Sequence, residues 1–250
     1  MTRILITGGG GFIGSHLART LYQQGHFVRI ADVKFDDYIQ EKYCTEKIDI
    51  DLRVWENCVK ATEGIERVYN LAANMGGIGF ITEVGAEVMH DNTLINTFML
   101  EASIQNKVKR YLFTSSACIY PTYRQKDPRI KGLREEDAYP ADPDNFYGWE
   151  KLYTEKMCEA YQRDYKMDIR VLRYHNIYGP EGTYKGGREK ARVRVRHSYT
   201  SKQFLSVFNI SMRISCIASC RTFCFDRACI IFFVHDRDHL YGRSHCAHCD

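Results

Sequence analysis

The chain lacks the long apolar segment that a membrane protein needs. No apolar run in its 250 residues approaches the ~20 that span a bilayer. The N-terminus also lacks a basic segment followed by an apolar stretch and a small-residue cleavage site, so no secretion signal is recognised. The net charge is only +4, and much of the excess base lies after residue 191, which argues against a nucleic-acid footprint. We therefore expect a cytoplasmic protein with no membrane or nucleic-acid partner.

Cysteine is scarce in the first part of the chain and crowded in the last. Residues 1–191 contain four cysteines, which fits a reducing compartment, whereas residues 192–250 contain six. Proline is absent from this second segment, and its strand and helix periodicities are unclear. The cysteine spacing complies only loosely with a zinc module, which usually shows matched ligand pairs. The abrupt change of composition instead favours a shifted reading frame or a translated intron, and we predict no metal site.

Strands and helices alternate from the N-terminus to about residue 173. Apolar runs predict strands at 3–7, 27–32, 48–51, 68–73, 111–114 and 169–173. Helical periodicity predicts helices from Ile13 to a stop at Gly25, and at 55–63, 86–106 and 147–165. This alternation predicts an α/β fold of the Rossmann type, with a doubly wound parallel sheet covered by helices on both faces.

A glycine-rich turn follows the first predicted strand and opens a helix. Gly8, Gly11 and Gly14 are spaced three apart, which differs from the commonest dinucleotide-binding spacing and is a weak signal alone. Its position between a strand and a helix favours a pyrophosphate site, because the helix N-terminus offers N–H groups to the anion. Phe12 and Ile13 belong to the same turn and are expected to contact the cofactor.

Two acidic residues extend this candidate cofactor site. Asp32 ends the second strand, where a carboxylate accepts hydrogen bonds from a ribose and repels a 2′-phosphate, so NAD is favoured over NADP. Lys34, two residues further on, leaves that preference open to test. Asp51 is either an adenine contact or a solvated strand end.

A serine, a tyrosine and a lysine form a candidate catalytic group. Tyr147 and Lys151 are four residues apart at the start of a predicted helix, so they share a face. A nearby ammonium favours the phenolate and would lower the pKa of Tyr147 toward the working pH. Tyr147 could then accept a proton from a sugar hydroxyl while Ser116, in the loop after strand 111–114, holds the same oxygen.

Five longer segments give the chain a resemblance to a known family. They are Asn70 to Phe80, Ser115 to Pro121, Tyr147 to Lys151, Arg173 to Pro180 and Gly186 to Ala191. On these segments, residues 1–191 resemble the extended short-chain dehydrogenase/reductase family (NAD-dependent epimerase/dehydratases) and, within it, the GDP-mannose 3,5-epimerase branch. The resemblance implies an isomerase with tightly bound NAD that converts GDP-mannose to GDP-L-galactose and GDP-L-gulose, in the nucleotide-sugar metabolism that leads to ascorbate. It also implies an NAD-binding domain at 1–191 and a non-homologous tail at 192–250, which truncates or replaces the substrate lobe.

The resemblance implies a reaction through a 4-keto sugar. Tyr147 with NAD would oxidise C4 of GDP-mannose, and the ketone would acidify the hydrogens on C3 and C5. Cys118 is implied as the base that removes these protons, and Lys190 as the acid that delivers protons on the opposite ring face. Without the resemblance, Cys118 is a small buried apolar residue and Lys190 a solvated surface lysine. Further residues implied at the substrate are Met75, Gly76, Ser116, Ala117, Asn176, Glu189 and Ala191.

Other functions stay open at this point. A complete family member would continue after residue 191 with a substrate lobe, so the chain could be an NAD-binding fragment without activity. An epimerase-reductase of the GDP-fucose synthase type is the nearest enzymatic rival, but it would use NADPH and a histidine as second acid, and Asp32 and Lys190 argue against it. Asn74 stands where the family more often has aspartate, which predicts tuned rather than lost function. A homodimer is kept as an expectation, since no motif encodes the oligomeric state.

Overall fold

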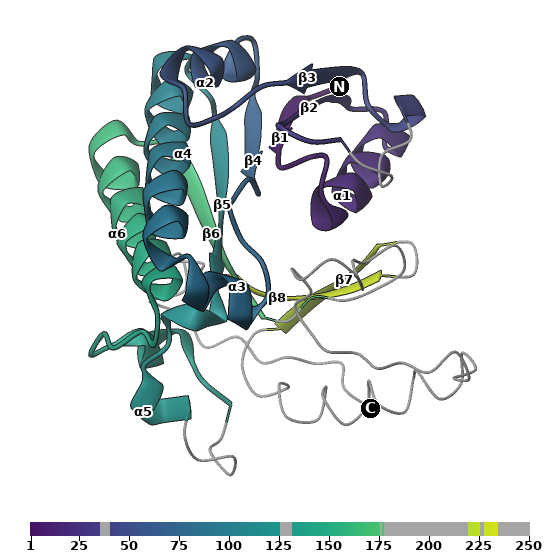
Figure 1. The fold of residues 1–250 in the computed structure, drawn as a ribbon. Coiled ribbons are helices and arrows are strands. Elements are labelled where there is room, and N and C mark those ends of the chain that lie inside the picture. Colours follow the sequence, from purple (N-terminus) through teal and green to yellow (C-terminus); the bar gives the residue numbers. More distant parts are fainter. Residues whose placement is uncertain (36–40, 126–131, 176, 178–219, 226–227, 235–250) are drawn as a thin grey trace, which may run out of the picture.

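A computed structural model describes residues 1–35, 41–125, 132–175, 177, 220–225 and 228–234 (Figure 1). The strands are β1 (Arg3–Thr7), β2 (Phe27–Asp32), β3 (Glu46–Asp49), β4 (Arg67–Asn70), β5 (Arg110–Ser116), β6 (Asp168–Tyr174), β7 (Cys220–Phe225) and β8 (Ala228–Val234). The helices are α1 (Phe12–Gln23), α2 (Trp55–Thr62), α3 (Ile78–Glu83), α4 (Gly85–Gln105), α5 (Thr122–Gln125) and α6 (Phe146–Tyr165). Three 3-10 turns are η1 (Glu41–Tyr43), η2 (Ala117–Ile119) and η3 (Glu135–Ala138).

The six strands of the predicted part form the parallel sheet that the alternating pattern predicts. Strands β1 to β6 pair in parallel in the order β3-β2-β1-β4-β5-β6. Figure 1 shows α2, α4 and α6 side by side on one face of the sheet and α1 on the other. The Rossmann-type fold is therefore confirmed. Because the order reverses between β1 and β4, the carboxyl ends of these two strands open the crevice in which such folds bind ligands.

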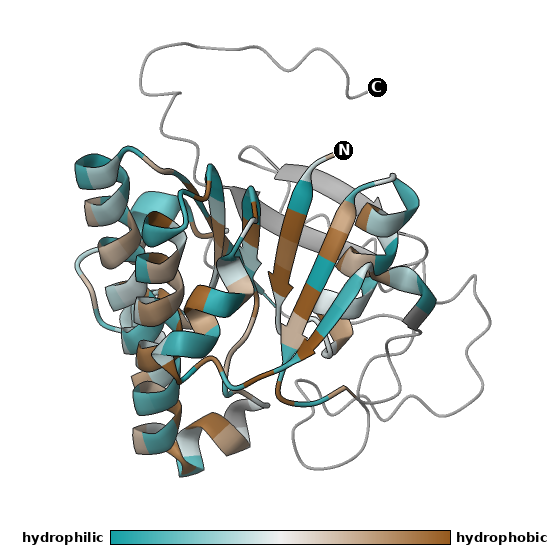
Figure 2. Cartoon of the chain, turned by 90° about the horizontal axis from the view of Figure 1, so that it is seen from above, coloured by the Kyte–Doolittle hydropathy of each residue, from teal (hydrophilic) through white to brown (hydrophobic). Residues whose placement is uncertain are grey.

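The core explains why the strands read as continuous apolar runs. Ile4, Leu5 and Ile6 of β1 have no exposed surface. Leu5 packs in the cluster under α2 and α4, whereas Ile4 and Ile6 pack in the cluster under α1, because successive strand side chains point to opposite faces. Figure 2 shows brown, apolar segments along the central strands and mixed colours on the helices.

Element ends differ from the sequence prediction where side chains intervene. β4 ends at Asn70 rather than residue 73, because the backbone N–H groups of Leu71 and Ala72 donate to Thr7 Oγ1 (both 3.1 Å). β3 lies two residues earlier than predicted, in register with β2 up to the pair of Asp32 and Asp49. The predicted stop of the first helix is confirmed, since Gly25 has φ +79° directly after the C-cap.

Two antiparallel strands continue the sheet beyond β6. β8 pairs with β6 over Leu172–Tyr174, and β7 pairs with β8. The unclear periodicity of the last segment did not predict them, although the run Ala-Cys-Ile-Ile-Phe-Phe-Val in β8 is typical of a strand. The predicted domain boundary at residue 191 lies outside the described residues. Within the described part of the chain, no helix has both the length and the apolar character to cross a membrane.

Candidate active site

In the turn between β1 and α1, Gly14 packs directly against the backbone of Gly8. A β-carbon on Gly14 would lie 2.2 Å from the carbonyl oxygen of Gly8, so α1 packs directly on the end of β1 only because Gly14 has none. Gly11 is the N-cap of α1 and makes no side-chain cap, and Phe12 and Ile13 begin the helix. The uncapped first turn therefore directs backbone N–H groups outward, as an anion site requires.

Asp32 lies beside this turn at the end of β2. Its Oδ2 accepts a hydrogen bond from Gly10 N (2.9 Å), and its Oδ1 accepts from Val33 N (2.8 Å) and Lys34 N (3.3 Å). Burial raises the pKa of Asp32, and the three backbone hydrogen bonds oppose that rise. The carboxylate thus stands next to the glycine turn, where an acid in a dinucleotide fold meets the ribose.

Asp51 is held in a surface ion pair. Its Oδ2 lies 2.7 Å from Arg53 Nη2, and Arg53 Nη1 reaches Asp91 Oδ2 at 3.0 Å. The Arg53 hydrogen bonds lower the pKa of Asp51. Whether Asp51 contacts the adenine or only ends a strand, its carboxylate is therefore already paired with Arg53.

The candidate catalytic residues converge at the carboxyl ends of the central strands. β5 ends at Ser116, and the 3-10 turn η2 that follows carries Ala117 and Cys118. Ser116 Oγ accepts a hydrogen bond from Cys118 N (3.2 Å). The Tyr147 hydroxyl lies 4.0 Å from Met75 Sδ, and Met75, Cys118 and Tyr147 belong to one hydrophobic cluster. Segments far apart in the sequence are thus brought to one place, with Gly76 buried beside them.

A glycine that sequence reasoning did not single out sets this packing. Helix α6 begins after Asn145, whose side chain accepts a hydrogen bond from Gly148 N (2.8 Å). A β-carbon on Gly148 would lie 2.2 Å from the carbonyl oxygen of Cys118 and 2.9 Å from Pro143 Cβ. Only a residue without a side chain lets the first turn of α6, with Tyr147, approach the Cys118 turn this closely.

The electrostatics of Tyr147 differ from the sequence prediction. Its pKa is raised well above the usual range, first by burial and then by the charges of Glu150 and Cys118, while a hydrogen bond with Ser116 lowers it. The expected lowering by Lys151 is therefore wrong for the protein as it stands. The physical reason is that the buried phenol loses more hydration than one hydrogen bond restores.

Lys151 is buried in the interior next to Tyr147. Only 1% of the residue is exposed, and its Nζ lies 5.5 Å from the centre of the Tyr147 ring and 4.8 Å from that of Phe113. Burial lowers the pKa of Lys151, and Glu150, whose Oε2 is 3.9 Å from Nζ, raises it. The shared helix face predicted for Tyr147 and Lys151 is present.

Asn74 fits its surroundings better than an aspartate would. Its Nδ2 donates to Glu87 Oε1 (3.2 Å) and to Asp91 Oδ2 (3.1 Å), and its backbone N–H donates to Asn92 Oδ1 (2.6 Å). An aspartate would face two carboxylates, which repel it. The amide therefore accounts for this departure from the family pattern.

Four predicted site residues lie outside the described residues: Asn176, Glu189, Lys190 and Ala191. Within the described ranges, no group of three or more potential metal ligands is found.

Sequence reasoning also missed two buried polar residues, Asn96 and Glu150. Asn96 is 1% exposed and Glu150 has no exposed surface. One signal was available: Asn92 and Asn96 continue the four-residue spacing between the apolar Val88 and Leu100, so they lie on the helix face that is buried.

Comparison with known proteins agrees with this geometry. A model of the NAD dependent epimerase/dehydratase family matches residues 4–212. The chain is 50% identical over 190 residues to GDP-mannose 3,5-epimerase of Arabidopsis thaliana, covering 76% of this chain and 50% of the relative. It is 29% identical over 182 residues to GDP-L-fucose synthase of Escherichia coli (strain K12), covering 73% and 53%.

Solved structures are similar over the same part. The UDP-glucose 4-epimerase of Thermus thermophilus in complex with NAD matches with a TM-score of 0.64 and 26% identity, over 74% of this chain and 58% of that chain. The chain spans about half the length of the two relatives compared in sequence, 50% and 53%.

Proposed function

Because the chain belongs to the NAD-dependent epimerase/dehydratase family, we propose that it is a sugar-nucleotide epimerase that converts GDP-mannose to GDP-L-galactose and GDP-L-gulose. The observation that carries the proposal is the packing of Tyr147 and Cys118 together with Met75, at the edge where the fold places ligands. One bound substrate could then contact both Tyr147, as the base for a hydroxyl, and Cys118, as the base for hydrogens on carbon. The likeness to a GDP-mannose epimerase supports the choice of sugar nucleotide. The epimerase-reductase alternative has the lower identity.

The glycine turn and Asp32 fit a dinucleotide. The close contact at Gly14 places the first turn of α1 directly on the end of β1, and Asp32 offers a carboxylate beside it. Bound NAD would supply a hydride acceptor for C4 and a positively charged ring. The residues proposed to hold it are Gly8, Gly11, Phe12, Ile13, Gly14, Asp32, Asp51, Tyr147 and Lys151.

Tyr147 is proposed to be the general base and acid for the C4 hydroxyl. Its phenolate would take that proton as C4 is oxidised and return it when C4 is reduced. Ser116, which hydrogen-bonds with Tyr147, would hold the same substrate oxygen. The buried ammonium of Lys151 is a positive charge of the chain near the ring, and its attraction for a phenolate would offset part of the rise that burial causes in the Tyr147 pKa.

Cys118 is proposed as the base at carbon. A 4-keto sugar has acidic hydrogens on C3 and C5, because each carbanion is an enolate, and the Cys118 thiolate would remove them in turn. Lys190 is proposed to deliver protons on the opposite ring face, and Gly76, Ala117, Asn176, Glu189 and Ala191 to bind the substrate.

Deuterium uptake tests the reaction. We would incubate the protein with GDP-mannose and NAD in deuterated water and measure the product mass. Uptake at C3 and C5 is expected, and Cys118→Ala should abolish it while NAD still binds. Cys44→Ala, a half-buried cysteine elsewhere in the fold, is the matched control and should keep the uptake. Normal uptake in Cys118→Ala would remove Cys118 from its role.

The second candidate is an NAD-binding chain without turnover. NAD binding with no deuterium uptake and no product would select it. We further propose that residues 192–250 form a tail unrelated to the NAD-binding part at 1–191, although the family model extends to residue 212. Sequencing the genomic and transcript regions around codon 191 tests this, since a restored frame should reveal further family motifs.

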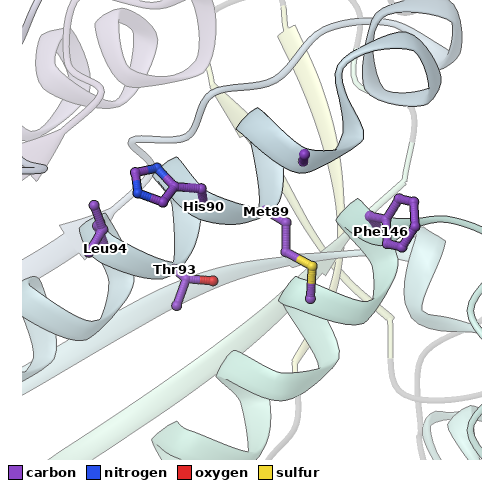
Figure 3. A pocket seen from close by; sticks show the side chains of 6 residues that line it. Met89, His90, Thr93, Leu94 and Phe146 are labelled. Carbon is purple, nitrogen blue, oxygen red and sulfur yellow. The ribbon is translucent and has the colours of Figure 1, made fainter.

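A homodimer is proposed through the outer face of α4 and α6. A shallow depression of about 480 Å³ lies there, lined by Ala86, Met89, His90, Thr93, Leu94 and Phe146. Figure 3 shows these side chains around it. Phe146 and Tyr153 are more than half exposed, and Trp149 lies near them on α6 at 43%. A second copy would cover these rings. Light scattering at known concentration should give twice the chain mass, and Phe146→Asp should return it to one; a single-chain mass for the unmodified protein would refute the dimer.

A further inference from the structure

A continuous line of buried polar side chains connects the glycine turn with Lys151. It runs from Thr7, directly before Gly8, through Asn70 of β4 and Asn96 of α4 to Glu150 of α6. None of these four side chains is more than 1% exposed. Burying so many polar groups costs stability unless all are satisfied, so the line calls for an explanation beyond packing.

The hydrogen bonds along this line all point in one direction. The backbone N–H groups of Leu71 and Ala72 donate to Thr7 Oγ1, so the Thr7 hydroxyl must give its own proton onward. It donates to Asn70 Oδ1 (2.7 Å), which orients the Asn70 amide so that Nδ2 donates to Asn96 Oδ1 (2.9 Å). The unambiguous backbone donors thereby fix which way both amides face.

The line ends on the carboxylate of Glu150. Asn96 Nδ2 donates to Glu150 Oε1 (2.6 Å), and Thr154 Oγ1 donates to the same oxygen (3.0 Å). The other oxygen, Oε2, accepts no hydrogen bond from the described residues and lies 3.9 Å from Lys151 Nζ. Two donors therefore hold one oxygen and leave the second beside the lysine ammonium.

We propose that Glu150 is a positioning residue that keeps Lys151 in its ammonium form beside Tyr147. Asn96 and Thr154 fix its carboxylate for this task. The inference rests on the proposed function, in which Lys151 assists Tyr147, and names a residue that acts on the lysine rather than on the substrate.

The other groups around Lys151 do not replace Glu150. Those that act on its charge are Glu150, Glu155 and Cys158, all from α6, and the strand β5 contributes the Phe113 ring. Glu155 is already paired with Arg173 through two contacts, of 3.0 and 2.8 Å. Of the two carboxylates that act on Lys151, Glu150 is the one that has no arginine partner among the described residues.

The negative charge of Glu150 also has an effect that opposes the proposed role of Tyr147. A negative Glu150 also raises the pKa of Tyr147, and burial lowers the pKa of Lys151. Because the carboxylate lies within 4 Å of Nζ, its first effect is on the lysine. Losing it would let Lys151 release its proton at a lower pH, so the alkaline limb of the activity profile would move to lower pH.

The direct test is a titration of Lys151 that requires neither NAD nor substrate. Lysine labelled with ¹³C at the ε-carbon would be followed by NMR against pH, with the Lys151 signal assigned by its loss in Lys151→Met. We expect Glu150→Gln to lower the Lys151 midpoint by about one pH unit or more. Glu159→Gln is the matched control, because it removes a surface partner of Lys156 on the same helix (3.0 Å) and should leave the midpoint unchanged.

The outcomes separate this inference from the proposed function. An unchanged Lys151 midpoint in folded Glu150→Gln would overturn it, whatever the turnover. If the unmodified protein takes up no deuterium from water, the proposed function fails while the titration still decides the role of Glu150. With turnover present, a structural role for Glu150 would lower activity at every pH, whereas the proposed role moves the alkaline limb.

The unmodified protein decides the question if Glu150→Gln does not fold. The chemical shift of the Glu150 δ-carbon, assigned by through-bond correlation, should then change with pH at the same midpoint as that of the Lys151 ε-carbon. Absence of that shared transition would contradict the inference.

Discussion

The two ends of the candidate site are built in different ways. At the cofactor end the backbone forms the site, because Gly14 packs on Gly8 and backbone N–H groups satisfy Asp32. At the catalytic end side chains form it, with Lys151 and Glu150 buried beside one another. A backbone site depends on local conformation, whereas a buried charge depends on partners from several elements.

The largest expected effect is the loss of NAD binding at the cofactor end of the site. Gly14→Val would place side-chain atoms against the Gly8 carbonyl oxygen, 2.2 Å from a β-carbon, and α1 would have to move. We expect NAD binding, measured by calorimetry, to be lost. Gly79→Val is the control, since a β-carbon there meets nothing within 4 Å, and it should bind NAD normally. Intact binding by Gly14→Val would show that the turn is not the cofactor site.

The next effect concerns the catalytic end alone. Tyr147→Phe keeps the ring but removes the hydroxyl that is proposed to carry the C4 proton, so deuterium uptake should fall about 10³-fold. Tyr153→Phe, on the exposed side of the same helix, should not change it. NAD binding should be unchanged in Tyr153→Phe and only weakened in Tyr147→Phe, because Tyr147 is itself proposed to contact the cofactor. A parallel loss of NAD binding in Tyr147→Phe would mean that the two ends are not separable.

A smaller effect sharpens the role of charge at the backbone end. Asp32→Asn keeps the side-chain shape but turns an amide toward backbone donors, so we expect NAD affinity to fall about tenfold. NADP should bind better relative to NAD than in the unmodified protein, because the carboxylate no longer repels a 2′-phosphate. An unchanged ratio of the two affinities would contradict the assignment of Asp32 to the ribose.

The same difference explains what could be read from the sequence. Strand β1, the stop at Gly25 and the turn at Gly8, Gly11 and Gly14 follow from local apolar runs and glycine positions, and the structure has them where predicted. The parallel pairing of β1 to β6 followed from the alternation of strands and helices, whereas their order in the sheet is known only from the structure.

The catalytic end could be predicted only in part. Ser116, Cys118 and Tyr147 were candidates from motifs, but the raised pKa of Tyr147 arises from burial that no local pattern encodes. Likewise Glu150 is one acid in a polar helix until the fold places Asn96 of α4 against it. Helix α3 was also missed, because a six-residue helix shows less than two turns of periodicity.

Everything proposed for the catalytic end presupposes that the chain holds a nicotinamide cofactor at the glycine turn. Calorimetric titration of the purified chain with NAD tests this most directly. The account predicts saturable binding of one NAD per chain, with NADP binding more weakly. No heat of binding at millimolar NAD, from a protein shown to be folded, would contradict it.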